Sequence, residues 1–179
     1  MIGTEEERLA ELNQLFPVWE KHTLWTMFKK SCVRTPSADF IVDAAGKTYS
    51  YRETEIEVSR TARALLALGI RAGDHVSLLM HNCPEFLFFT FALARIGAVK
   101  NMVNPNVGRE ELGYVLKSAE TDYIISESLI DDGFFRTMPR IKKAVVLNKN
   151  KLYRSRYSCL KEEFEALAEE VGDAKLEAE

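Results

Sequence analysis

The sequence predicts an α/β protein with a mainly parallel sheet that has helices on both faces, plus an N-terminal helical segment and a small hairpin. Two observations support this fold class. From residue 50 onwards, short apolar runs bounded by turn residues alternate with stretches of helical periodicity. This alternation is typical of strand–helix–strand units, whose strands run parallel. The 179 residues, 46% of them hydrophobic, are enough for one domain with a substantial core.

The first 30 residues are predicted to be helical in two pieces that are separated near Pro17. Thr23 is a suitable cap for the second piece, because a threonine hydroxyl can accept a hydrogen bond from a backbone amide in the first turn. The apolar face of this second helix would consist of Leu24, Met27 and Phe28.

A short β-hairpin is expected next, with arms at residues 40–42 and 47–49 and a turn at residues 45–46. Directly after it, Ser50 and Glu53 have the spacing of a capping box. In that motif the serine hydroxyl accepts from the amide three residues on, and the glutamate accepts from the serine amide. The sequence therefore predicts that a helix begins at this point.

Apolar residues recur at helical spacing in this helix, at Val58, Ala62, Leu65 and Leu66. Gly69 follows where a left-handed C-terminal cap is expected. The run at residues 75–80 is predicted to be a strand covered on both faces, because it is mostly apolar and bounded by turn residues. Further strands are expected at residues 99–103, 122–126 and 144–148, and helices at 109–119 and around 128–138.

The stretch HNCPEFLFFTFALARIGAV, residues 81–99, is predicted to hold a buried helix that starts at Asn82 and ends before Gly97. Its apolar residues point around the whole circumference, which is typical of a helix buried on all sides. At roughly 20 Å it would be shorter than the roughly 30 Å hydrocarbon core of a bilayer, so no transmembrane segment is predicted. Because 179 residues leave little room to bury such a helix completely, part of its surface is expected to meet other protein.

The C-terminal part divides into a basic and an acidic segment. Residues 140–156 contain seven Lys or Arg and no acidic residue, whereas residues 160–179 contain eight acidic residues and two lysines. The acidic segment has the pattern of an amphipathic helix, with Phe164, Leu167, Ala168 and Val171 on one face. A solvated basic loop next to this acidic helix is the expected arrangement.

Composition argues against several classes of function. The net charge of −3 gives no overall attraction to nucleic acid or anionic lipid, and no secretory signal opens the chain. Three widely spaced cysteines, Cys32, Cys83 and Cys159, are typical of reduced thiols in a cytoplasmic protein. The tyrosines among the basic residues 149–157 are compatible with nucleic-acid binding, but the negative net charge favours the solvated loop.

The sequence contains no recognisable catalytic motif and no recognisable metal-binding motif. It contains no glycine-rich phosphate-binding motif. His81 and Cys83 are two possible metal ligands where three or four are needed, so a loop histidine beside a buried cysteine is expected instead. Arg95 is the one charge inside an otherwise apolar helix, near the end where a cation favours the helix dipole. Its expected role on these grounds is to cap that helix end and reach solvent.

Residues 24–147 closely resemble the N-terminal portion of the AMP-forming acyl-CoA synthetases, a superfamily that also includes amino-acid-adenylating domains. The resemblance lies in several motifs in a consistent order: Tyr49 to Glu53, Leu68-Gly69, Gly73 to Val76, Asn82 to Phe86, Gly97 to Val99, Asn104-Pro105 and Glu110 to Leu112. The HNCPEF and NPN sequences are most similar to fatty-acid or crotonobetaine/carnitine-type ligases. Met102, Asn106 and Gly108-Arg109 depart from the usual pattern, which affects the subfamily and not the fold.

The resemblance implies that residues 1–179 are a single N-terminal subdomain of a larger ligase. Its expected parts are a helical lead-in at 1–30, an α/β core at 31–147, and a basic loop with an acidic amphipathic helix at 148–179. In the family, the phosphate-binding loop and the catalytic lysine lie beyond the matching region. The chain is therefore expected to be a fragment, natural or designed, that is inactive alone and contacts the remaining subdomains.

By resemblance, the parent enzyme would convert a small carboxylic acid and ATP into an acyl-adenylate and then a CoA thioester, using Mg²⁺. Neither ATP nor CoA is expected to bind the fragment tightly. The resemblance assigns Arg95 to a phosphate group of CoA, as an alternative to its capping role. Two other functions stay open: a stand-alone CoA- or partner-binding module on the same fold, and a fragment of an amino-acid-adenylating domain. An exposed apolar patch or a dimer of the fragment is also expected.

Overall fold

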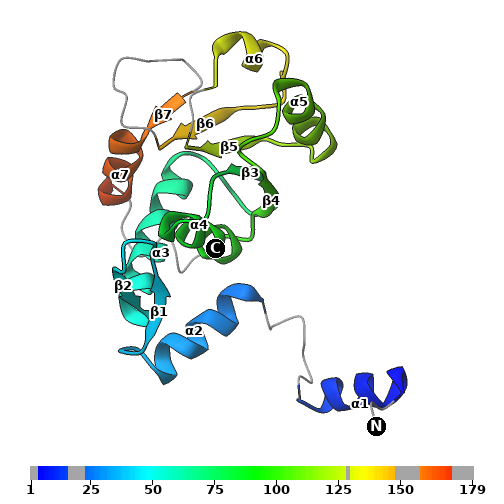
Figure 1. Cartoon of the computed structure of the whole chain (residues 1–179), viewed down its shortest axis with the longest axis vertical. Helices are drawn as coiled ribbons and strands as arrows, with labels where there is room; N and C mark the ends of the chain where they lie inside the picture. The colour runs from blue at the N-terminus through cyan, green and yellow to red at the C-terminus, as the bar shows by residue number, and fades with distance from the viewer. Residues whose placement is uncertain (1–3, 16–22, 128–129, 148–157, 171–179) are drawn as a thin grey trace.

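The computed structural model describes residues 4–15, 23–127, 130–147 and 158–170. Figure 1 shows the arrangement of the elements. The helices are α1 (Glu5–Leu15), α2 (Leu24–Arg34), α3 (Tyr51–Ala67), α4 (Pro84–Arg95), α5 (Arg109–Ser118), α6 (Asp132–Arg136) and α7 (Lys161–Glu170). The strands are β1 (Asp39–Val42), β2 (Thr48–Ser50), β3 (His75–Leu79), β4 (Val99–Val103), β5 (Tyr123–Ser126), β6 (Lys143–Val146) and β7 (Ser158–Leu160).

Five strands form a parallel sheet in the order β4-β3-β5-β6-β7, and β1 and β2 form a separate antiparallel hairpin. In the sheet, Val76 of β3 lies between Lys100 of β4 and Tyr123 of β5. The predicted α/β class, parallel sheet and hairpin are confirmed. The sequence analysis did not predict β7, a three-residue strand that is too short to produce a periodic pattern.

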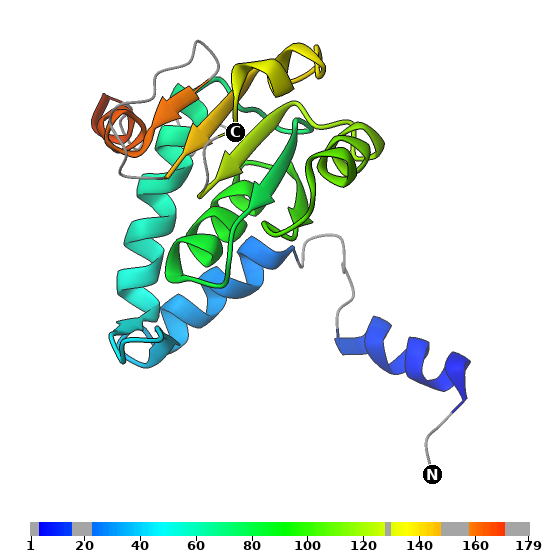
Figure 2. The ribbon, with the colours of Figure 1, turned by 45° about the horizontal axis from the view of Figure 1, so that its top comes forward.

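Helices cover both faces of the sheet, as predicted (Figure 2). On one face, α2, α3, α4 and α7 pack over a core in which Val58, Leu65, Val76 and Leu93 are fully buried. On the other face, α5 and α6 enclose a second core whose members include Leu116 and Phe135. Strand β3 contributes to both cores, since Leu78 belongs to the first and Leu79 to the second.

The phenylalanine-rich helix α4 is buried largely by this chain itself. Phe88, Phe89 and all positions from there to Leu93 are buried. The Phe91 ring stacks on Phe28 of α2 with 4.3 Å between centroids, and Phe89 lies 5.5 Å from the ring of Phe164 in α7. Residues 88–93 therefore need no cover from other protein, and the expectation that part of the helix surface meets other protein stays a prediction for the partly buried Phe86 and Leu87. The sequence argument did not anticipate that α2 and α7 would both pack beside it.

The predicted caps hold at two of three helices. The Thr23 hydroxyl accepts from the Thr26 amide at 3.2 Å. At the start of α3 the capping box is complete: the Glu53 amide donates to the Ser50 hydroxyl at 3.2 Å, and the Ser50 amide donates to the Glu53 carboxylate at 2.8 Å. For α4 the prediction is wrong by one residue, because Cys83 and not Asn82 is the N-cap residue.

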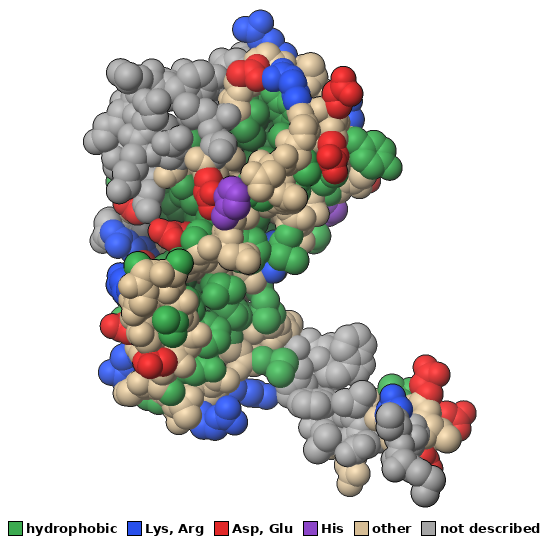
Figure 3. All heavy atoms as spheres, viewed as in Figure 1, with side chains coloured by type: hydrophobic (Ala, Val, Ile, Leu, Met, Phe, Trp, Pro, Cys, Tyr) green, Lys and Arg blue, Asp and Glu red, His purple; other side chains and the backbone are tan. Residues whose placement is uncertain are grey.

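The predicted apolar face of α2 is also partly wrong. Phe28 is buried, but Leu24 and Met27 are about half exposed, and Cys32 is the second buried residue. Phe28 and Cys32 are four positions apart, so they form one stripe on the side of the helix that packs into the core. Figure 3 shows that hydrophobic side chains reach the surface around β1, β2 and α2.

Several other predictions have a definite outcome. Gly69 has a φ of +99° and ends α3 in a Schellman motif, in which the amide of Ile70 donates to the carbonyl of Leu65 at 3.1 Å. The predicted helix around 128–138 is shorter than expected, at Asp132–Arg136. The acidic helix is present as α7, with Phe164 buried. Pro17, the basic loop at 148–157 and Val171 lie outside the described residues. Among the described helices, none has both the length and the apolar character needed to cross a bilayer.

Candidate functional site

The order of the strands marks one place on the sheet where a ligand is most readily bound. In chain order the five strands take the positions 2-1-3-4-5, so the chain leaves β3 towards one edge and later returns to place β5 on its other side. In open α/β sheets, ligands bind in the crevice outside the carboxyl ends of the strands where the order reverses. Here that point lies between the carboxyl ends of β3 and β5.

The residues that follow these two strands are joined by a pair of hydrogen bonds. The carboxylate of Glu127 accepts from the backbone amide of His81 and from the imidazole Nδ1 of His81, each at 2.9 Å. The amide nitrogen of Asn106, in the loop after β4, lies 3.3 Å from Nε2 of the same ring. An amide NH₂ can only donate, so Nε2 accepts and the proton of the neutral ring lies on Nδ1.

A crevice opens beside His81, with a volume of about 340 Å³. Its walls come from the ends of β3 and β4 and the first turn of α4, and they combine apolar groups such as Phe86 and Met102 with the polar side chains of Asn82 and Asn104. A second groove of about 510 Å³ shares Asn82 and Phe86 with it and runs on towards the hairpin. The carboxyl edge of the sheet is thus hollowed on both sides of Phe86.

The surroundings of Cys83 favour neither a nucleophilic thiolate nor a metal ligand. Burial, together with nearby carboxylates, raises the pKa of its thiol above the ordinary value, so the reactive thiolate is disfavoured. His81 and Cys83 share Glu127 as a partner, since the Cys83 sulfur lies 4.0 Å from Glu127 Oε1. Within the described part of the chain, no group of three or more His, Cys, Asp or Glu side chains is arranged to hold a metal ion.

Arg95, the residue assigned to CoA by resemblance, lies at the other end of α4. Its guanidinium carbon is 4.6 Å from the centroid of the Trp25 ring in α2, and its Nη1 donates to the Ser59 hydroxyl in α3 at 2.8 Å. The side chain is half-buried among these three helices. It is therefore packed between three helices while part of it stays exposed to solvent. The structure does not bring Arg95 and His81 together, because α4 separates them.

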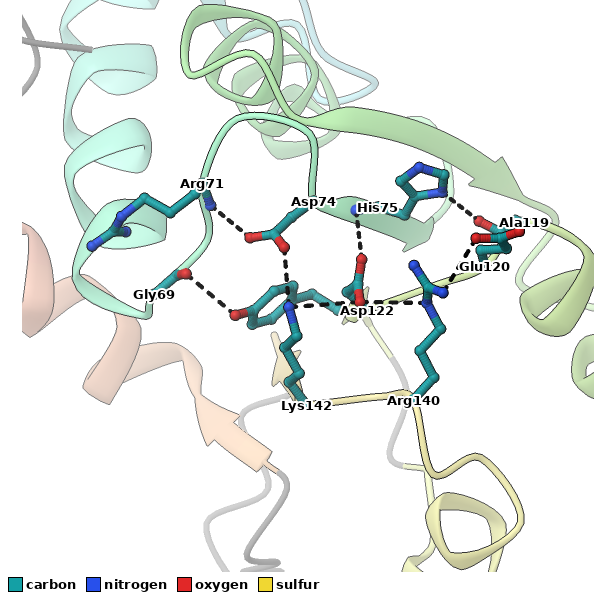
Figure 4. A network of polar contacts seen from close by, with 10 residues as sticks. Gly69, Arg71, Asp74, His75, Ala119, Glu120, Asp122, Arg140 and Lys142 are labelled. Atoms are coloured by element: carbon teal, nitrogen blue, oxygen red, sulfur yellow. Dashed lines mark hydrogen bonds and ion pairs between the residues drawn. The ribbon is translucent and has the colours of Figure 1, made fainter.

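The amino edge of the sheet carries a network of charged side chains (Figure 4). Asp122 accepts from the backbone amide of His75 at 3.0 Å and pairs with Arg140 and Lys142. Lys142 also donates to Asp74 at 3.0 Å. The network links the loops before β3, β5 and β6, so its role is to stabilise this edge of the sheet.

Sequence reasoning missed Glu127, Asn106 and Trp25. Glu127 and Asn106 follow strands of the predicted parallel sheet, so their place after a strand was the available signal. What the sequence lacked was the strand order, which determines that β3 and β5 are neighbours. No pattern in the sequence pairs Trp25 with Arg95.

Comparison with known proteins gives consistent matches. The model of the family described as AMP-binding enzyme matches residues 28–176. The crotonobetaine/carnitine–CoA ligase of Escherichia coli O139:H28 is 41% identical over 80 residues, which are 45% of this chain and 16% of that protein. The chain thus matches less than a fifth of the length of this curated relative.

Two solved structures illustrate the shared fold. The N-terminal subdomain of Klebsiella oxytoca NpsA is 30% identical, with a TM-score of 0.57 over 61% of this chain and 28% of that one. Coronafacic acid ligase from Pectobacterium brasiliense has a TM-score of 0.71 at 18% identity, covering 80% of this chain and 29% of that one. The family match spans most of the sequence and agrees with the fold and the order of the motifs, so this chain belongs to the AMP-binding enzyme family.

Proposed function

We propose that this chain forms the N-terminal subdomain of an AMP-forming carboxylate–CoA ligase of the cytoplasm. Such an enzyme activates a carboxylic acid with ATP as an acyl-adenylate and then transfers the acyl group to the thiol of CoA. The observation that carries the proposal is the family match over residues 28–176, together with the 41% identity to a crotonobetaine/carnitine–CoA ligase. The two described cysteines that are free thiols, Cys32 and Cys83, are consistent with the cytoplasm.

The described residues do not fit ATP or Mg²⁺. The sequence contains no glycine-rich loop that would surround phosphates with backbone amides, and the described residues provide no cluster of carboxylates for a magnesium ion. The contribution of this chain to adenylate formation is therefore proposed to be structural: it supplies a rigid sheet and helices for the remaining subdomains. A small carboxylic acid, related to those of the crotonobetaine/carnitine ligases, is the proposed substrate of the whole enzyme.

The described residues do fit a phosphate group of CoA at one point. Arg95 is always charged at physiological pH, and a guanidinium forms charge-assisted hydrogen bonds to phosphate. Trp25 and Ser59 hold it in one orientation, so little conformational entropy would be lost on binding. We propose that Arg95 contacts a phosphate of CoA and that Trp25 and Ser59 position it.

A chimeric enzyme tests the proposed function. In the E. coli crotonobetaine/carnitine–CoA ligase, the segment that corresponds to residues 24–147 is replaced by these residues of this chain, so that Trp25, Ser59 and Arg95 are all included. We expect the chimera to release pyrophosphate from ATP in the presence of its carboxylic acid and to form the CoA thioester. A chimera that folds and forms no acyl-adenylate would contradict the proposal.

The 179-residue chain alone separates this function from a stand-alone binding module. We expect it to produce no AMP from ATP and carboxylic acid and to bind CoA only weakly in a calorimetric titration. Tight CoA binding by the isolated chain would favour the stand-alone module instead.

A further inference from the structure

We propose that the crevice beside His81 is a separate binding site for a small apolar ligand that is neutral or positively charged, with His81 accepting a hydrogen bond from it. The site is distinct from the contact proposed between Arg95 and CoA, because His81 and Arg95 lie at opposite ends of α4. The three arguments for it are its place on the sheet, the fixed orientation of the imidazole and the charge of its surroundings.

The crevice lies where the fold favours ligand binding. It opens at the carboxyl ends of β3 and β4, next to the reversal of strand order between β3 and β5. Its volume of about 340 Å³ is at the lower end of the usual range for small-molecule sites, roughly 300 to 1,000 Å³. Apolar side chains with a few polar groups are the usual lining of such sites, and Phe86, Met102 and Pro105 supply the apolar part here.

The imidazole of His81 is prepared to accept a hydrogen bond. One carboxylate oxygen of Glu127 accepts a hydrogen bond from Nδ1 of His81, and the other oxygen accepts from the backbone amide of His81. These two hydrogen bonds fix the orientation of the ring. This arrangement places the acceptor lone pair on Nε2. The contact from Asn106 to Nε2 is long, at 3.3 Å, and 61% of the His81 side chain is exposed. A ligand O–H or N–H can therefore replace Asn106 at this nitrogen with a shorter hydrogen bond.

The surroundings disfavour an anion. Among the described residues that line the crevice and the adjoining groove there is no Lys or Arg, whereas Asp43 lines the groove and Glu127 lies behind His81. The start of α4 contributes a partial positive charge of roughly half a unit. Glu85 in its first turn carries a full negative charge that offsets it. The local balance is negative, which attracts a cation and repels a carboxylate or phosphate.

Three probes with the same aromatic body and different charges test this proposal on the 179-residue chain: benzylammonium, benzyl alcohol and benzoate. Binding is followed by NMR through the methyl groups of Met80 and Met102 and the ring of His81. We expect saturable shifts at these groups with benzylammonium and benzyl alcohol, and binding of benzoate that is at least about tenfold weaker. Absence of saturable shifts with the first two probes would overturn the site, and equal binding of benzoate would overturn the charge argument.

Two variants separate the hydrogen bond from the charge. His81→Ala is expected to weaken binding of benzyl alcohol by about fivefold, the effect of one lost hydrogen bond. Glu127→Gln keeps an oxygen acceptor for Nδ1 and removes the charge, so it should weaken benzylammonium selectively and leave benzyl alcohol nearly unchanged. Lys117→Ala, on the exposed side of α5, is the matched control and should change neither. If His81→Ala binds benzyl alcohol as tightly as the unaltered chain does, His81 does not accept a hydrogen bond from the ligand. The titrations of the unaltered chain with the three probes test the site itself, so the proposal can still be tested if a variant fails to fold.

Discussion

The guanidinium group of Arg95 lies over the indole ring of Trp25, with 4.6 Å between the guanidinium carbon and the ring centroid. Because Nη1 of the same group also donates to Ser59, one side chain connects α2, α3 and α4. These two residues are 70 positions apart in the sequence, so the contact depends on the packing of α2 against α4. The same contact bears on stability and on the proposed binding of CoA, and the two effects can be measured separately.

The stability effect is best measured with a double-mutant cycle of Trp25→Ala and Arg95→Ala. We expect a coupling free energy of about 0.5–2 kcal/mol, the range for a cation–π pair between exposed and desolvated limits. Denaturant unfolding of the four proteins gives this value directly. Met27→Ala, on the same helix but half exposed, serves as the control and should couple to Arg95 by less than the experimental error. A Trp25–Arg95 coupling near zero would show that the contact does not stabilise the fold.

The functional effect is predicted for Arg95→Gln in the chimeric ligase. Loss of a charge-assisted hydrogen bond to phosphate, worth about 1.5–3 kcal/mol, should raise KM for CoA by about 10- to 100-fold. The rate of acyl-adenylate formation should stay unchanged, because that half-reaction does not use CoA. Steady-state kinetics with varied CoA and a pyrophosphate-exchange assay measure the two steps separately. An equal loss in acyl-adenylate formation and in thioester formation would indicate that Arg95 acts only through its packing between the helices and does not contact CoA.

Asp122 is predicted to make stability fall in acid. Burial by itself would raise the pKa of its carboxyl group, but the His75 amide, Lys142 and Arg140 together lower the pKa below the ordinary value of 3.8. A group with a lowered pKa in the folded state stabilises the fold fully above its ordinary pKa, and this contribution is lost as the pH falls through the folded-state value. The predicted loss therefore occurs below about pH 4.

Asp122→Asn should lower the free energy of unfolding at pH 7 by about 1–3 kcal/mol, because the substitution removes a charged acceptor and leaves its partners in place. The difference between the two proteins should shrink as the pH is lowered towards 2, since the native carboxylate is then protonated too. Urea unfolding at several pH values measures both effects. Asp39→Asn, on the exposed start of β1, is the control. A constant difference at all pH values would contradict the electrostatic explanation.

The capping box at α3 offers a prediction for a purely local motif. Ser50→Ala removes the hydroxyl that accepts from the Glu53 amide, so unfolding free energy should fall by about 0.5–2 kcal/mol. Ser37→Ala, an exposed serine just before β1, should have no comparable effect. Equal effects of the two substitutions in thermal or urea unfolding would show that the cap contributes no stability to α3.

Local features of this fold could be predicted from sequence, and relationships across the sheet could not. The capping box at Ser50 and the left-handed Gly69 depend on neighbours within a few positions, and both are confirmed. The pairing of His81 with Glu127 spans 46 positions and requires that β5, and not β4, lies on that side of β3. Periodicity gives the direction of strands but not their order, so the crevice beside His81 became visible only in the structure.

The burial of α4 shows a similar limit. The apolar residues around its whole circumference correctly predicted burial. Besides α3, however, two of the partners that bury it, Phe28 and Phe164, come from helices more than 60 positions away on either side. A pattern within one helix says how much of its surface must be covered and does not say by what. The expectation that other protein covers part of this surface stays a prediction for the partly buried Phe86 and Leu87.

A comparison of two phenylalanines of α4 tests whether this chain alone stabilises the helix. Phe91 is 7% exposed and stacked on Phe28, whereas Phe86 is only partly buried, beside the crevice. Phe91→Ala should lower the free energy of unfolding by about 3–5 kcal/mol, since truncation of a buried aromatic ring removes its contacts and leaves a cavity. Phe86→Ala should have a clearly smaller effect, because part of its ring already faces solvent. If denaturant unfolding of the 179-residue chain gives similar values for both, α4 is not held in place by this chain, and the cover expected from other protein would be needed after all.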